Sequence, residues 1–255
     1  MTASGTNTRV SDNIAAAGVD QHPRGDAHLP RTGAHLPDTM VRYLAEGIGT
    51  LFLVFTVGAS VRNGSVLAPL AIGAVLMAMI YAGGHISGGH YNPAVTVAAL
   101  VRGRIGLRDA IGYWIAQFFG GLLGAGAVLL AVGPGQVETA PGQVEALSLS
   151  GHALVAAFVA ELLFTFALCY VVLNVATSKD HPNNSFYGLA IGFTVIAGAV
   201  AVGGVSGAAF NPAVVVGGVA MGLFSAPLLL TYIGAQVIAG IAAGFAFRAL
   251  NPDDK

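Results

Sequence analysis

Two asparagine residues, each followed by proline and alanine, have the types and spacing to build a polar site inside an apolar chain. One lies in the segment SGGHYNPAVTVAALVRG and the other in SGAAFNPAVVVGGVAMG. Asparagine favours the start of a helix because its side-chain oxygen accepts an unpaired backbone N–H. Proline suits the first helical position, where its missing N–H costs nothing. Each triplet therefore predicts a helix start with an asparagine amide that can donate hydrogen bonds. The residues are Asn92, Pro93 and Ala94 in the first triplet, and Asn211, Pro212 and Ala213 in the second.

The elements around these triplets have the composition of a membrane protein. Hydrophobic residues make up 55% of the 255 residues and charged residues 9%, whereas soluble domains carry about 25% charged residues. A bilayer span needs about 20 apolar residues, and the run after each triplet is apolar for only about 10, which predicts a re-entrant half-helix. The sequence thus predicts an all-α polytopic membrane protein. Six segments are long enough to span, over about residues 41–61, 66–84, 108–132, 152–175, 186–204 and 226–248.

The two halves of the chain repeat each other. AEGIGTLFLVF, which contains Glu46, corresponds to AELLFTFALCY, which contains Glu161. Gln117 and Gln236 each follow the asparagine of their own half by 25 residues. Each half holds three full spans, an odd number, so the second half enters the membrane from the opposite side. Such inverted repeats place a site near the bilayer midplane, where the two half-helices are expected to meet head to head.

The meeting point of the half-helices has the chemistry of a pore for neutral molecules. Each helix N-terminus carries roughly half a positive charge, and two of them facing one point oppose the passage of cations. The asparagine amides supply donors. The glycine-rich segments before each triplet are expected to be irregular backbone, tolerated where it lines protein or water, with carbonyls as acceptors. These glycines are Gly83, Gly84, Gly88 and Gly89 in the first half, and Gly203, Gly204 and Gly207 in the second.

Two carboxylates lie inside apolar segments, at Glu46 and Glu161. An intramembrane carboxylate indicates a functional site, and a buried acid needs hydrogen-bond partners. We expect each glutamate to accept backbone N–H groups of the loop before its own half-helix, with proton transfer as the alternative. Gln117 and Gln236 are interpreted as hydrogen-bonding residues between helices.

The other reactive side chains do not indicate catalysis. His85 and His90 flank the loop before the first triplet; a pore-lining role and loop capping both remain open, and neither has the spacing of a metal ligand. A single cysteine, Cys169, excludes an intrachain disulfide. The net charge of −1 offers no basic surface for nucleic acid. Without a phosphate-binding loop or a nucleophile–base pair, we expect no enzyme, cofactor, metal or nucleic-acid partner.

The distribution of positive charge predicts the orientation. With the amino terminus in the cytoplasm, all but one of the 11 Lys and Arg residues fall on the cytoplasmic side, and only Arg62 falls outside. This bias places both termini in the cytoplasm. Residues 1–38 contain no apolar run and are predicted to form a disordered cytoplasmic tail. Residues 39–255 form the membrane domain, with repeats over about 41–132 and 152–248.

The sequence resembles the aquaporin (major intrinsic protein) family. The features that carry the resemblance are the paired triplets in inverted repeats, the paired glutamates, and the segments GHISGGHYNPAVTVAALVRG and IAQFFGGLLGA. The resemblance covers about residues 41–248 and looks most like bacterial water channels of that family. It implies six tilted helices with two half-helices, a pore in every protomer, a homotetramer, and a place in the bacterial plasma membrane. It also implies that Asn92 and Asn211 face the pore.

The family has an external constriction of four side chains, which the resemblance places at Ile72, Ala199, Ala208 and Val214. The position of Val214 is normally arginine, which offers donors and repels cations. Its loss is expected to widen the constriction and leave the half-helix dipoles as the main barrier. An all-apolar ring can instead dewet and impede water. The glycerol branch of the family typically has aspartate at the position of Val215, so this chain looks more like the water-channel branch.

We therefore expect a passive channel for water and other small neutral solutes. The alternative is a facilitator mainly for small uncharged solutes such as glycerol, ammonia, hydrogen peroxide or dissolved gas. A secondary transporter is another alternative, because such proteins also contain inverted repeats and broken helices. Their coupling ions usually need carboxylates or polar side chains at the midplane, and beyond their first two residues the predicted spans hold no acidic residue besides Glu46 and Glu161. A closed structural protein is the remaining alternative.

Overall fold

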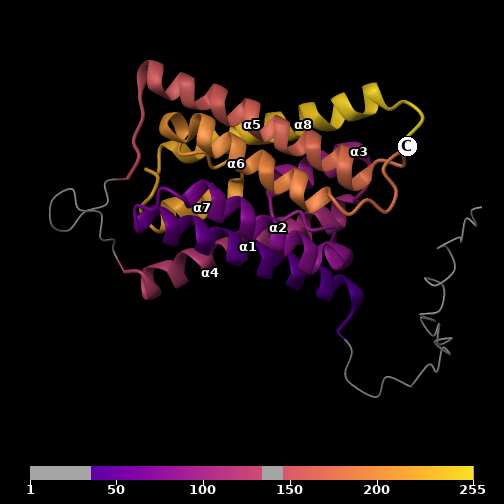
Figure 1. Ribbon diagram of the computed structural model, residues 1–255, viewed down its shortest axis with the longest axis horizontal. Helices are drawn as coiled ribbons and strands as arrows, with labels where there is room; N and C mark the ends of the chain where they lie inside the picture. Colours follow the sequence, from indigo (N-terminus) through magenta and orange to yellow (C-terminus); the bar gives the residue numbers. More distant parts are fainter. Residues whose placement is uncertain (1–35, 134–145, 255) are drawn as a thin grey trace, which may run out of the picture. The chain divides into compact units, whose positions relative to one another are not determined.

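The computed structural model describes residues 36–133 and 146–254. In this part of the chain it contains eight α-helices, six long and two short (Figure 1). The tail predicted over residues 1–38 lies outside the described residues as far as His35, and α1 already begins at Asp38. The helices are α1 Asp38–Arg62, α2 Ala68–Ser87, α3 Pro93–Arg102, α4 Leu107–Ala131, α5 Gly151–Thr177, α6 Tyr187–Ser206, α7 Pro212–Ala220 and α8 Leu228–Leu250.

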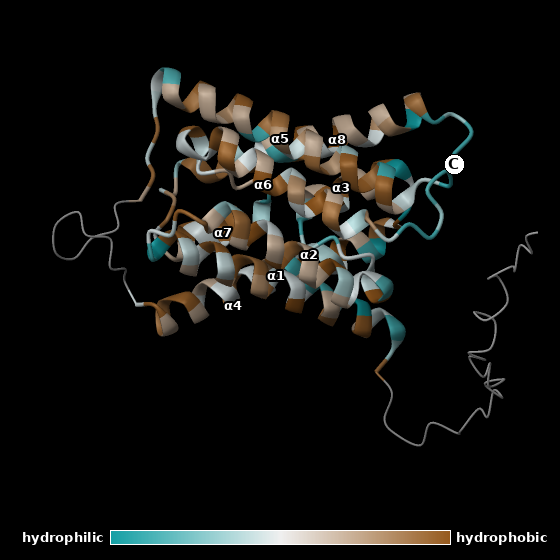
Figure 2. Cartoon of the chain, viewed as in Figure 1, coloured by the Kyte–Doolittle hydropathy of each residue, from teal (hydrophilic) through white to brown (hydrophobic). Residues whose placement is uncertain are grey.

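The six long helices confirm the predicted all-helical membrane fold. Each is long and apolar enough to cross a bilayer, and each agrees with its predicted span to within a few residues. Large apolar side chains cover their outer faces, such as Leu130 at 91% and Leu230 at 83% exposure. Apolar surface of this extent marks contact with lipid or another protein. Figure 2 shows hydrophobic residues along the helices and hydrophilic residues gathered in the connections at their ends.

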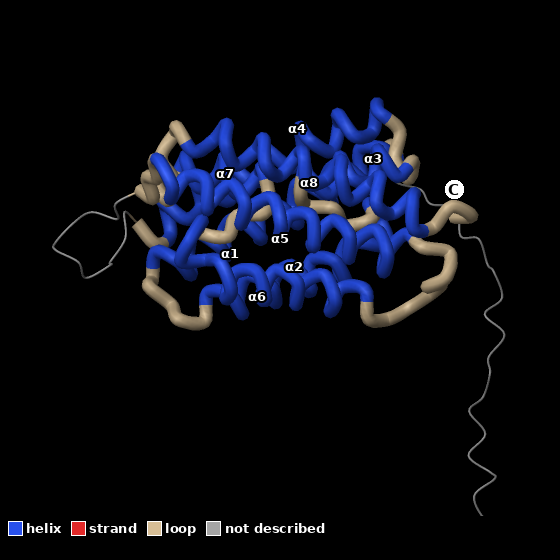
Figure 3. Tube along the Cα trace, turned by 90° about the horizontal axis from the view of Figure 1, so that it is seen from above, coloured by secondary structure: helices blue, strands red, loops and turns tan. Residues whose placement is uncertain are grey.

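The two short helices, α3 and α7, pack against long helices of the opposite repeat. α3 contacts α8, and α7 contacts α4. Glycine allows both close approaches. A Cβ on Gly240 would collide with the Ala94 carbonyl oxygen at 2.5 Å, and a Cβ on Gly121 would lie in a tight contact, 3.0 Å from the Ala213 carbonyl oxygen. Figures 1 and 3 show α3 and α7 toward opposite ends of the long helices, with loops between them. The repeats therefore interlock around two half-helices.

The loops that lead into the half-helices are shorter than predicted. α2 continues to Ser87 and α6 to Ser206, so only five residues separate each from its triplet's proline. Left-handed glycines end both helices, Gly88 at φ 89° and Gly207 at φ 77°. A continued helix satisfies its own backbone hydrogen bonds, which irregular backbone at membrane depth does not. The prediction of irregular backbone is wrong for Gly83, Gly84, Gly203 and Gly204.

Candidate pore

Each triplet begins a half-helix with its asparagine as the N-cap. Asn92 has φ −155° and ψ 120°, and its Oδ1 accepts the Ala94 N–H at 2.8 Å. Asn211 has φ −156° and ψ 117°, and its Oδ1 accepts the Ala213 N–H at 2.9 Å. The near-identical geometry follows from the local sequence alone, since asparagine caps the helix and proline occupies its first turn.

The two asparagine amides also join the half-helices to each other. Asn92 Nδ2 donates to the Phe210 carbonyl oxygen at 2.9 Å, and Asn211 Nδ2 donates to the Tyr91 carbonyl oxygen at 2.9 Å. Each amide group carries two N–H donors, so one donor per asparagine is left after this exchange. Tyr91 and Phe210 both have φ 47°, a left-handed conformation uncommon for bulky residues. The exchange brings the two helix starts together, as the inverted repeat requires.

Glu46 holds the first loop through four hydrogen bonds. Its Oε1 accepts from the His90 N–H at 2.9 Å and the Ser87 hydroxyl at 2.7 Å. Its Oε2 accepts from the Tyr91 N–H at 2.7 Å and from Gln117 Nε2 at 2.9 Å. The glutamate is fully buried. Its carboxylate thus replaces the partners that these donors would lack in lipid.

Glu161 repeats this arrangement in the second half. Its Oε1 accepts from the Ala209 N–H at 2.9 Å and the Ser206 hydroxyl at 2.7 Å. Its Oε2 accepts from the Phe210 N–H and from Gln236 Nε2, each at 2.8 Å. Both glutamates therefore face the loop of their own half, and neither lines the central cavity described below.

Four further residues support the loops, and the sequence analysis did not single them out. Tyr113 and Tyr232 donate their hydroxyls to the Ser87 and Ser206 carbonyl oxygens, each at 2.6 Å. The repeat contains the signal that identifies them. Each tyrosine stands four residues before the paired glutamine, and each serine stands five residues before the paired asparagine.

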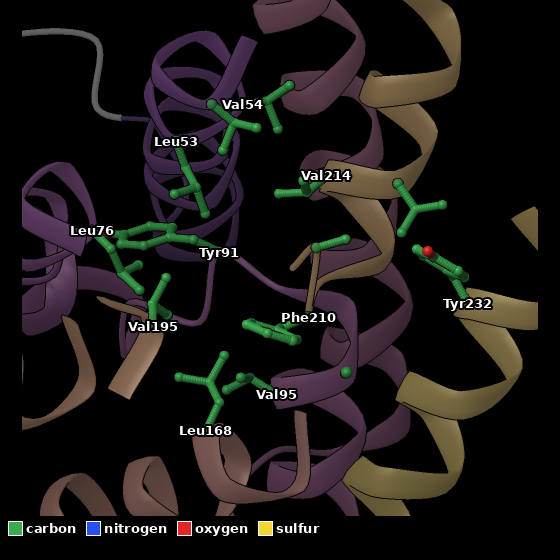
Figure 4. Packing of buried hydrophobic residues seen from close by; sticks show 14 of the residues in the cluster. Leu53, Val54, Leu76, Tyr91, Val95, Leu168, Val195, Phe210, Val214 and Tyr232 are labelled. Carbon is green, nitrogen blue, oxygen red and sulfur yellow. The ribbon is translucent and has the colours of Figure 1, made fainter. Parts of the chain in front are cut away.

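A central cavity lies where the half-helices meet. The cavity volume open to the centres of water molecules is about 30 Å³. One water needs about 10–15 Å³ on this measure. Asn92, Asn211 and His90 are its polar side chains, and the other lining side chains are apolar. Figure 4 shows seven of these apolar side chains converging from different helices and loops. They are Leu53, Leu76, Val95, Leu168, Val195, Phe210 and Val214.

Three of the four predicted constriction residues line this cavity. Ile72, Ala208 and Val214 are among its walls, and Val214 is buried. Ala199 is half-buried and does not line it. Val195, which lies one turn earlier on α6, does. The geometry therefore brings together an apolar wall and two asparagine donors.

The two histidines of the first loop lie in different places. His90 lines both the central cavity and a larger space, the arginine-side vestibule, at the face where α1 begins. The volume of this vestibule open to the centres of water molecules is about 440 Å³, and its walls include Arg42, Arg104 and Lys179. His85 is exposed and lines a smaller neighbouring depression instead. Among residues 36–133 and 146–254, no group of three or more His, Cys, Asp or Glu is arranged to hold a metal ion.

The arginine-side face is tied together by the carboxyl-terminal segment. Asp254 accepts from Arg102 at 2.6 Å and from the Lys179 N–H at 2.9 Å, and Arg104 lies 3.3 Å away. Desolvation opposes ionisation of this carboxyl, but the Lys179 N–H and the Arg102 guanidinium outweigh it and lower the pKa of Asp254. Arg62 lies on the other face, donating to the Met221 carbonyl oxygen and to that of Gly133.

Comparisons with known proteins agree with this architecture. Residues 35–202 match the sequence model of the family described as major intrinsic protein. The "Glycerol uptake facilitator protein-like 6" of Lactiplantibacillus plantarum is 40% identical over 220 residues, which cover 84% of this chain and 100% of that protein. "Aquaporin TIP1-2" of Musa acuminata is 36% identical over 252 residues, covering 88% of this chain and 96% of the relative.

A solved structure shows the same fold. The X-ray structure of the aquaglyceroporin from Plasmodium falciparum matches with a TM-score of 0.62 and 21% sequence identity. The match covers 84% of this chain and 95% of that one.

Proposed function

Because the chain belongs to the major intrinsic protein family, whose members are passive channels for water and small solutes and not enzymes, we propose that it conducts water through a pore in each protomer. The pore runs from the arginine-side vestibule through the central cavity to the opposite face. Water and other small neutral molecules pass in single file.

The observation that carries this proposal is the meeting of Asn92 and Asn211 in a cavity with otherwise apolar side chains. Each is the N-cap of a half-helix, and each keeps one N–H that is not used in the exchange with the opposite loop. A water that accepts from these donors stays hydrogen-bonded at the narrow centre. A cation there meets two helix N-termini, each with roughly half a positive charge, and loses its hydration shell.

A second candidate, a facilitator mainly for small uncharged solutes, is favoured by the apolar wall. Val214 stands where the family normally has arginine, and Ile72 and Ala208 line the same cavity. Without the arginine side chain, we expect the wall to be wider and better suited to molecules with carbon or gas-like character. The relative from Lactiplantibacillus plantarum is named a glycerol uptake facilitator-like protein, which supports testing glycerol first.

We also propose the membrane setting and the assembly. The protein is an integral membrane protein, and we place it in a bacterial plasma membrane as a homotetramer with both termini in the cytoplasm. The orientation is supported by cations that gather at one face. Arg102, Arg104 and Lys179 contact the carboxyl-terminal segment, and Arg42 lines the same vestibule as Arg104 and Lys179. Positive residues favour the cytoplasmic side.

Within this channel, Glu46 and Glu161 brace the loops. Each carboxylate accepts four hydrogen bonds from its own half, two from loop backbone N–H groups, one from a serine hydroxyl and one from a glutamine amide. This role leaves no oxygen aimed at the permeant, and we therefore prefer bracing over proton transfer. Gln117 and Gln236 connect each carboxylate to a neighbouring long helix.

Stopped-flow light scattering on proteoliposomes tests the proposal. Water, glycerol and a proton gradient are applied to loaded vesicles and to empty vesicles. Fast water flow of low activation energy without proton leak is the expected result for a water channel. Solute uptake without water flow would select the facilitator. No flow in any of the three assays would refute both and favour a closed structural protein.

A further inference from the structure

We propose that Arg62 determines the charge selectivity of this pore together with the half-helix dipoles. Its guanidinium places a fixed positive charge at the far end of α7, and this charge acts through space on cations that enter the narrow centre. Arg62 thereby supplies part of the charge that position 214 lacks. This inference rests on the proposed channel function and concerns the exclusion of cations, not the flow of neutral solutes.

Arg62 joins the end of α1 to the end of α7, on the face opposite the arginine-side vestibule. It is 4% exposed. Its Nη1 donates to the Gly133 carbonyl oxygen at 3.0 Å, and its Nη2 donates to the Met221 carbonyl oxygen. Met221 is the C-cap of α7, and the N-cap of the same helix, Asn211, lines the central cavity. A helix of nine residues is about 14 Å long, which sets the distance between the guanidinium and the cavity.

Holding two carbonyl groups does not by itself account for an arginine at this place. Among the described residues, no carboxylate forms an ion pair with Arg62, and its Nε is buried without a hydrogen-bond partner. Burying an incompletely paired charge costs stability, whereas a neutral side chain with two donors would hold the same carbonyls without that cost. The site therefore keeps a positive charge where packing needs only hydrogen-bond donors.

The end of the other half-helix carries no comparable buried charge. Arg102 lies in the last turn of α3, as Arg62 lies against the last residues of α7. Arg102 pairs with Asp254 at 2.6 Å, and both side chains are buried. The neighbouring Arg104 is exposed, so solvent and salt screen it. The two half-helices thus differ, and the unpaired charge lies on the α7 side, where valine replaces the usual arginine.

The size of the effect follows from this distance. One unit charge about 14 Å away, at an effective dielectric constant of about 20, changes the population of a monovalent cation at the centre about sevenfold. A water molecule carries no net charge and does not sense this difference. Removing the charge should therefore change cation leak and leave water flow in place.

The first test measures proton leak and water flow on the same proteoliposomes and expresses leak per unit of water flow. Arg62→Gln, which keeps side-chain donors but removes the charge, should raise this ratio about five- to tenfold, with water flow within about twofold of the wild type. Arg62→Lys keeps the charge and should match the wild type. Arg248→Gln is the control, because it removes an exposed charge from the arginine-side face. A ratio in Arg62→Gln equal to that of the wild type, including one at the level of empty vesicles, would overturn the proposal.

The second test separates the charge from the hydrogen bonds that Arg62 makes. Adding Val214→Arg to Arg62→Gln restores a positive charge on this side of the pore and should return the leak to the wild-type level. A leak that persists in the double variant would assign it to loosened packing and refute the proposal. If Arg62→Gln does not fold, Asn63→Asp decides, because it places a carboxylate beside an intact Arg62. It should raise the leak about twofold in low-salt buffer, and an unchanged leak would refute the role of the charge. Wild-type vesicles without water flow would instead refute the channel function itself.

Discussion

Replacing Glu161 by Gln tests whether this buried acid braces the second loop. Each carboxylate oxygen accepts one backbone N–H and one side-chain donor, and the residue has no solvent exposure. Glutamine keeps one acceptor oxygen and turns the other into an NH2 donor. If the new NH2 faces Gln236, that residue can turn its unpartnered Oε1 toward it, but the Phe210 N–H is left without an acceptor. If it faces Ser206, the hydroxyl can rotate, but the Ala209 N–H is left alone.

At least one buried backbone N–H therefore loses its acceptor in Glu161→Gln. Such a loss costs about 1–3 kcal/mol. For a chain of this size, that corresponds to a fall in melting temperature of about 2–12 °C. Glu161→Ala leaves all four donors without an acceptor and should lower the folded yield much further, because total stability is only about 5–15 kcal/mol.

The assay is thermal unfolding of purified protein in detergent, followed by fluorescence-detected size exclusion, together with water flow in proteoliposomes at several pH values. Thr165→Val is the control on the same helix. Thr165 is buried four residues after Glu161, and its hydroxyl has no partner in the described residues, so its loss should leave the melting temperature unchanged or higher. The reasoning fails if Glu161→Gln melts with the wild type and its conduction loses a pH dependence that the wild type shows. That result would assign proton transfer to Glu161.

Three further substitutions test other parts of the structure. Val214→Arg should narrow the cavity and reduce glycerol uptake relative to water; unchanged solute uptake in proteoliposomes would show that Val214 is not at a constriction. Val215→Thr places a hydroxyl where Thr96 stands in the first repeat and should stabilise the protein by about 0.5–1.5 kcal/mol, because Gln236 Oε1 gains a donor; an unchanged melting temperature would contradict this. Folding lowers the pKa of Asp254 below its ordinary value of 3.8. The ionised carboxylate therefore stabilises the fold at pH values above 3.8, and this stabilisation is lost as the pH falls through the lower pKa of the folded state. Asp254→Asn should therefore remove that part of the acid sensitivity in melting curves below about pH 4, and identical curves would refute it.

Features that repeat in both halves were predictable from sequence, because two copies of one signal reinforce each other. Asparagine and proline fix the half-helix starts by local geometry, and the odd number of spans requires the halves to be inverted. The paired glutamates and glutamines were readable for the same reason. Tyr113 and Tyr232 carry an equally regular spacing, but a tyrosine in an apolar helix also fits simple packing. Only the structure shows each hydroxyl donating to a loop carbonyl oxygen.

Features that depend on three-dimensional packing could not be predicted from the sequence. Runs of glycine suggested irregular backbone, yet Gly83 and Gly84 continue α2, because a helix satisfies its backbone groups at membrane depth without other partners. The two loop histidines looked equivalent in sequence, and the structure places His90 in the cavity wall and His85 in a separate depression. The helical turn that separates Val195 from Ala199 decides which of them faces the cavity.

We propose that cation exclusion in this channel depends on backbone geometry more than on a side-chain charge. Asn92 and Asn211 cap two helices that start at the same cavity, and each N-terminus carries roughly half a positive charge. The cavity has room for on the order of two waters and is otherwise apolar, so an entering cation loses most of its hydration and finds no carboxylate among the lining residues. These dipoles persist whatever side chain follows the second triplet. Valine at position 214 lacks the charge that arginine would add there, so in the proposed channel these dipoles form the main barrier to cations.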